Sequence, residues 1–176
     1  IDINTAPMFT KEFVDHPATS GGTVTLRYTI TNTNPNASLT EIAFTDDLSD
    51  GGSGAAGVIP GLTATGLPKS DICGTGSALS GNTQVSFTGG SLAAAGQAGD
   101  SCSFDVVLQM PDEIATGTYP STTSELTATP AGASPATDDL IIVAAPTLRK
   151  EFIDAPATPG ASVTLQYTLT HSENAP

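Results

Sequence analysis

A segment near the start of the chain is repeated near its end, and this duplication constrains the architecture more than any other feature. Residues 6–33 read APMFTKEFVDHPATSGGTVTLRYTITNT and residues 145–172 read APTLRKEFIDAPATPGASVTLQYTLTHS, an ungapped offset of 139 residues with 16 of 28 positions identical. A repeat at fixed spacing indicates similar units placed in series. We therefore expect residues 1–5 to end a preceding unit, 6–144 to form one complete repeat, and 145–176 to begin the next.

Within the unit, apolar side chains recur at every second position, which is the signal of β-strands. Val24, Leu26, Tyr28 and Ile30 alternate with threonines and one arginine. Further strands are expected at 8–14, 41–48, 83–88, 102–110, 116–128 and 137–143. Clusters of Gly, Pro, Asn and Asp separate these strands. The long segment 49–81 is expected to be a loop. No window has convincing helical periodicity. About seven to eight short strands without helices predict an all-β sandwich.

The charge of the chain excludes some partners. The chain has 18 acidic and 5 basic residues and a net charge of -13. Nucleic acids and anionic membrane surfaces both need clustered Lys and Arg, so we expect neither as a partner. The sequence also has no apolar run long enough to span a bilayer, so no membrane insertion is expected in this segment. Because the chain begins at Ile1 and not at Met, we expect a mature or excised segment.

Several motifs together carry a resemblance to a known family. They are A-P-x-x-x-K-x-F-x-x-x-P from residue 6, G-x-x-V-T-L-x-Y-T-x-T from residue 21, F-T-D-D-L from residue 44, and GDSCSFDV at 99–106. The chain resembles the conserved Ig-like tandem repeat of large bacterial cell-surface and adhesin-like proteins. The resemblance covers most of residues 6–129 and returns at 146–170. It implies an Ig-like sandwich in an exported, extracellular stalk or fibre, and no catalytic residues.

Two cysteines, Cys73 and Cys102, are present. Exported domains with two cysteines usually pair them, so we expect a disulfide. The alternative is two buried free thiols. No C-x-x-C redox or zinc motif is present.

A lysine lies on an apolar strand face. Alternation places Lys11 on the same face as Phe9 and Phe13, and a buried charge needs a partner. Asp46 and Asp138 also lie on apolar faces of their strands. Two interpretations stay open: a Lys–carboxylate ion pair at the rim of the sandwich with the lysine head in water, or an intramolecular isopeptide bond from Lys11 to Asp46 or Asp138, assisted by the other acid.

Neither metal binding nor catalysis has a strong motif. Asp46, Asp47, Asp138 and Asp139 are candidates for calcium, which prefers clustered oxygen ligands, although no D-x-D-x-D-G loop is present. Solvated strand ends are the alternative. The chain has only two histidines and no G-x-S-x-G elbow, so we expect no enzyme and no cofactor.

The function expected from these features is structural. The chain would be a building block of an extracellular stalk, fibre or filament, with neighbouring repeats or further copies as head-to-tail partners. The alternative is an adhesin module whose loops bind a host or matrix ligand, and a third is an accessory domain of an enzyme.

Residues 145–176 supply only two strands of a unit, and an isolated pair of strands is marginally stable in water. We expect it to be completed by another chain, to continue a polymer of repeats, or to dock on the first unit.

Overall fold

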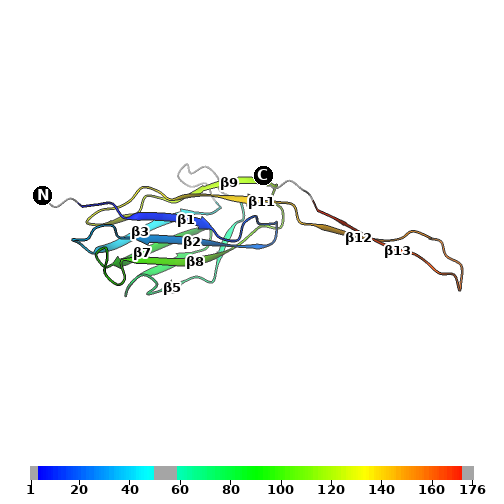
Figure 1. The fold of residues 1–176 in the computed structure, drawn as a ribbon, viewed down its shortest axis with the longest axis horizontal. Helices are drawn as coiled ribbons and strands as arrows, with labels where there is room; N and C mark the ends of the chain where they lie inside the picture. The colour runs from blue at the N-terminus through cyan, green and yellow to red at the C-terminus, as the bar shows by residue number, and fades with distance from the viewer. Residues whose placement is uncertain (1–3, 50–58, 172–176) are drawn as a thin grey trace.

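The computed structural model describes residues 4–49 and 59–171, and these residues form β-strands joined by turns, without a helix (Figure 1). The described part of the chain therefore has no helix long and apolar enough to cross a lipid bilayer. The strands are β1 (Met8–Phe13), β2 (Thr23–Thr31), β3 (Leu39–Asp47), β4 (Thr63–Thr65), β5 (Lys69–Ser70), β6 (Ala78–Gly81), β7 (Gln84–Leu92), β8 (Ser101–Gln109), β9 (Gly117–Thr122), β10 (Thr127–Thr129), β11 (Thr137–Ile142), β12 (Thr147–Phe152) and β13 (Leu165–Thr170).

Two larger sheets face one another and make a β-sandwich. One has the strand order β1-β2-β8-β4 and the other the order β10-β3-β7-β6-β5, with antiparallel pairing throughout. The predicted alternation of β2 is confirmed, since Val24, Leu26, Tyr28 and Ile30 are all buried and the residues between them are more exposed. Period-two patterning thus turns one face of each sheet toward a shared core.

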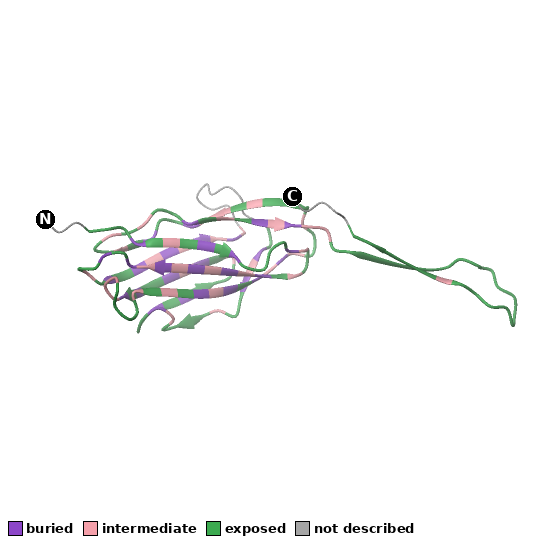
Figure 2. Ribbon diagram, in the orientation of Figure 1, coloured by how far each residue is buried: buried purple, intermediate pink, exposed green. Residues whose placement is uncertain are grey.

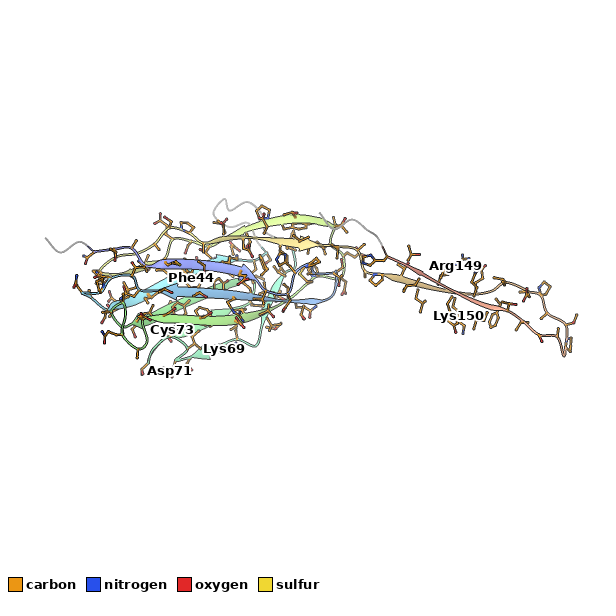
Figure 3. All side chains as sticks on the ribbon, in the orientation of Figure 1. Phe44, Lys69, Asp71, Cys73, Arg149 and Lys150 are labelled. Atoms are coloured by element: carbon orange, nitrogen blue, oxygen red, sulfur yellow. A yellow bond between two sulfur atoms is a disulfide. The ribbon has the colours of Figure 1, made fainter. Side chains whose placement is uncertain are left out.

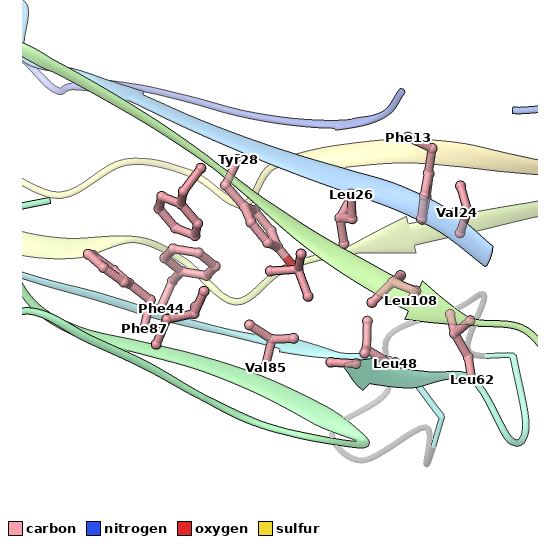
Figure 4. Packing of buried hydrophobic residues seen from close by; sticks show 14 of the residues in the cluster. Phe13, Val24, Leu26, Tyr28, Phe44, Leu48, Leu62, Val85, Phe87 and Leu108 are labelled. Carbon is pink, nitrogen blue, oxygen red and sulfur yellow. The ribbon is translucent and has the colours of Figure 1, made fainter. Parts of the chain in front are cut away.

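Aromatic rings fill one end of that core and join the sheets (Figure 4). The ring of Tyr28 on β2 lies 5.0 Å from that of Phe44 on β3, centroid to centroid, and Phe87 on β7 lies 5.2 Å from Phe104 on β8. Tilted and offset rings at these separations are favourable beyond the area that they bury. The contacts fix β2 and β8 over β3 and β7.

A separate two-stranded sheet closes the side of the sandwich beside β1. Strands β9 and β11 pair antiparallel, and the chain after β1 runs parallel to β11 through a bridge between Ala18 and Ile142. The amide of Ala18 donates to the carbonyl of Ile141 at 2.8 Å, and the amide of Val143 donates to the carbonyl of Ala18 at 2.9 Å. The chain thus enters the unit on β1 and leaves it on β11, side by side in the same direction.

Strands β12 and β13 form a hairpin that projects from the end of the sandwich opposite to the first described residues (Figure 1). Its register repeats that of β1 and β2 residue for residue: Met8 pairs with Thr31, and Thr147 with Thr170. The hairpin does not dock on the first unit, and its side chains are almost all exposed (Figure 2). Leu169 is 72% exposed, whereas its counterpart Ile30 is fully buried.

The number of strands exceeds the prediction. Eleven strands, β1 to β11, lie in the described part of the complete unit, against the expected seven to eight. The segment 116–128, expected as one strand, divides into β9 and β10 because the chain crosses between partners there. Thr123 bonds to Ala136 beside β11, whereas Ser124 bonds to Thr45 on β3. The expected loop 49–81 contains β4, β5 and β6, and residues 50–58 of it lie outside the described part.

Candidate functional site

The most unusual polar site is a charged pair between the two sheets. The Nζ atom of Lys11 on β1 lies 2.6 Å from Oδ2 of Asp46 on β3, and both side chains are 0% exposed. Alternation predicts only that each residue lies on an apolar strand face, and it leaves the partner of Lys11 open between Asp46 and Asp138. The pair is not at the rim, however, and the lysine head is not in water, because the two sheets close over it. Full removal of both charges from water is expensive.

Two hydroxyls complete the contacts of the pair. The hydroxyl of Tyr28 donates to Oδ2 of Asp46 at 2.5 Å, and Nζ of Lys11 donates to Oγ of Ser121 on β9 at 2.5 Å. Oδ1 of Asp46 is buried and has no hydrogen-bond partner among the described residues. The carboxyl group is thus engaged on one oxygen only.

Burial shifts the titration of these groups. It lowers the pKa of Lys11 from its usual value, and the neighbouring Asp46 and the more remote Asp138 oppose that shift. Burial, together with the charge of Asp46, raises the pKa of Tyr28 well above its usual value. The phenol therefore stays protonated and acts as a hydrogen-bond donor.

Asp138 joins the site by a different contact. Its Oδ2 accepts a hydrogen bond of 2.6 Å from the backbone amide of Phe13 and so holds β11 against β1. Lys11 bonds to Asp46 and Ser121, and the charge of Asp138 acts on it only electrostatically. The structure thus brings the three predicted residues together and separates the roles of the two acids.

Sequence reasoning missed Tyr28 and Ser121 as members of the site. Tyr28 was assigned to the core by its alternation, and the need of a buried phenol for a polar partner could have flagged it. Ser121 gave no signal, because its segment 116–128 lacks clear periodicity.

The four calcium candidates do not converge. No group of three or more His, Cys, Asp or Glu side chains that could hold a metal is found within residues 4–49 and 59–171. Asp46 is occupied by Lys11 and Tyr28, and Asp138 by the amide of Phe13. Asp47 and Asp139 follow them along each strand and point to the opposite face, because successive side chains in a strand alternate.

The predicted disulfide is present. Cys73, in the turn between β5 and β6, bonds to Cys102 on β8, and their Cα atoms are 5.7 Å apart. The bond ties the edge of one sheet to a central strand of the other. Figure 3 places Cys73 in the body of the sandwich, far from Lys150 on the projecting hairpin.

Comparison with known proteins gives a family without an assigned function. The family described as Domain of unknown function (DUF7933) matches residues 7–142, which include the buried pair and the disulfide. The chain belongs to the DUF7933 family. No curated protein and no solved structure matches it. The DUF7933 match ends where β11 ends, and the hairpin β12–β13 lies beyond it.

Proposed function

We propose that the chain is a structural building block of an extracellular stalk, fibre or filament made of Ig-like sandwich units in series. The observation that carries the proposal is the hairpin β12–β13. It repeats the sequence and the register of β1–β2, and it leaves the sandwich at the end opposite to the chain's entry (Figure 1). Only residues 143–146 separate it from β11. A connection this short favours units placed end to end.

The exposed face of the hairpin supports the same proposal. Leu148, Phe152, Val163, Tyr167 and Leu169 are between 46% and 72% exposed, so an apolar strip, interrupted by Lys150, faces solvent. In the complete unit the equivalent strip of β1 and β2 contributes to the core. Apolar strips of this kind mark surfaces that other protein segments cover. The strip is thus suited to a neighbouring unit or a further copy.

The disulfide of the unit is suited to an extracellular location. A disulfide persists in oxidising surroundings, outside the cytosol. The described part of the expected ligand-binding loop, residues 59–81, forms strands of the sandwich and its disulfide turn. The structural role is therefore favoured over the alternative of an adhesin module.

Electron microscopy of the purified chain tests the proposal. One unit has a longest strand of nine residues, about 30 Å at 3.4 Å each, and is about 35–45 Å long with its loops. We expect filaments or end-to-end rods with an axial repeat near that length or a small multiple of it. The variant Leu169→Lys should shorten them while leaving the circular dichroism of the sandwich unchanged. Isolated globules at every concentration would contradict the proposal.

A further inference from the structure

The buried Lys11–Asp46 pair has features that an ordinary ion pair does not explain. Both side chains are fully excluded from solvent, and one carboxylate oxygen has no partner in the described structure. A buried ion pair offsets its desolvation only when its remaining lone pairs and protons are satisfied. An unpaired buried carboxylate oxygen is among the most costly polar groups that a core can hold. A neutral product formed from the same two groups would remove both charges from the core.

We propose that Lys11 and Asp46 condense to an intramolecular isopeptide bond, which joins β1 of one sheet to β3 of the other. The inference rests on the geometry of this pair and goes beyond the proposed assembly of units. The nucleophilic nitrogen lies 2.6 Å from an oxygen of the carboxyl group that it would attack. Groups held in such contact react with effective molarities of about 10⁵–10⁸ M in favourable cases.

The reaction balances without any further reactant. A proton passes from the ammonium group of Lys11 to Oδ2 of Asp46, which gives an amine and a carboxylic acid. The amine nitrogen then attacks Cγ of Asp46, so that an N–C bond forms. The bond from Cγ to Oδ2 breaks, and Oδ2 leaves as water with a second proton from the same nitrogen. Oδ1 remains as the amide carbonyl, and no group is oxidised or reduced.

The surroundings favour the loss of a proton from Lys11 and the departure of water. Burial favours the neutral amine of Lys11, as its lowered pKa reflects. The phenol of Tyr28 donates to Oδ2 and so polarises the bond from Cγ to the oxygen that departs as water. The Lys11 head is held against Asp46 by its bond to Ser121. Tyr28 and Ser121 are thus positioning residues.

The chain carries its own control for this chemistry. Lys150 is the counterpart of Lys11 in the duplicated segment, and it pairs with Tyr167 as Lys11 pairs with Tyr28. It is exposed on the projecting hairpin (Figure 3), and no carboxylate forms an ion pair with it among the described residues. Only one of the two equivalent lysines should therefore react.

Intact mass of the full chain, folded and then reduced and denatured, is the decisive measurement. We expect a mass lower than that of the sequence by one water molecule, and a branched proteolytic peptide that joins Lys11 to Asp46. Lys11→Arg should restore the full mass, whereas Lys150→Arg should still lose one water. Asp46→Asn should lose ammonia in place of water and reach the same final mass as the cross-linked wild type.

The wild-type chain alone can overturn the proposal, so the test does not depend on a variant that folds. A folded chain with the full mass of its sequence after prolonged incubation would mean that the pair stays ionic. A branched peptide that contains Asp138 and not Asp46 would overturn the assignment of the acyl partner. If the Lys11→Arg variant still lost one water, the assignment of Lys11 as the nucleophile would be overturned.

Discussion

Opening the Cys73–Cys102 disulfide should lower the stability of the sandwich by an amount that the structure allows us to work out. The bond joins residues 29 apart in sequence. The chain-entropy relation for a closed loop of this length gives about 12 cal/mol/K, or about 3.6 kcal/mol at 25 °C. For a domain of this size that corresponds to a fall in Tm of roughly 7–14 °C. Because reduction removes no heavy atoms, no cavity contributes to the loss.

Urea unfolding of the oxidised and reduced chains, followed by circular dichroism, measures the effect. The denaturation midpoint should fall on reduction. The slope of the free energy of unfolding against urea should rise, since the unfolded chain without the bond exposes more surface. A loss below about 1 kcal/mol with an unchanged slope would refute the reasoning, because it would mean that the bond does not restrict the unfolded chain.

Three further changes probe other parts of the fold. Gly81→Ala should cost about 2–4 kcal/mol in urea unfolding, because Gly81 has a φ of +112° and an added Cβ would lie 1.8 Å from a backbone carbonyl oxygen. The Arg27 guanidinium holds the pKa of Asp105 below its usual value. Their pair therefore stabilises the folded chain at pH values above the unfolded-state pKa of about 3.9, and this stability is lost as the pH falls through the depressed pKa. The urea midpoints of wild type and Arg27→Ala should converge in acid and in high salt. In the dissociated chain, Ile30→Ala should cost about 2–5 kcal/mol, whereas Leu169→Ala at the equivalent position should change the free energy of unfolding by less than about 0.5 kcal/mol.

Each of these predictions has a control variant or an outcome that would contradict it. Gly96 also has a positive φ, but an added Cβ would meet no atom within 4 Å, so Gly96→Ala should cost only about 1 kcal/mol. Equal losses of stability at Gly81 and Gly96 would mean that the backbone near Gly81 shifts to make room for the added Cβ. A gap between wild type and Arg27→Ala that widens in acid would reverse the sign given for Asp105. Equal losses at Ile30 and Leu169 in the dissociated chain would mean that the hairpin packs against its own unit.

The sequence predicts the central strands and the faces of their side chains. Strict alternation marks β2 and β8, and the alternation of β1 and β3 predicts apolar strand faces for Lys11 and Asp46. Strand pairing was not predictable, because β2 and β8 are separated by about 70 residues and nothing local specifies that distant partners share a sheet. The burial depth of the lysine was missed for the same reason.

Short elements were the other source of error. Strands β4, β5 and β6 have two to four residues each, which is too few for a period to be recognised. They form because β8 offers an edge to β4 and β7 offers one to β6, which in turn pairs with β5. The division between β9 and β10 likewise follows from a change of partner along the chain, which only the folded arrangement reveals.

The parallel course of β1 and β11 has a mechanical consequence. Tension along a series of units would enter each one at the start of β1 and leave it at the end of β11, at opposite ends of the body (Figure 1). The hydrogen bonds beside these strands would then be loaded in shear, many at once, and would not be unzipped one after another. A unit connected in this way should withstand a much larger pulling force than its equilibrium stability alone suggests.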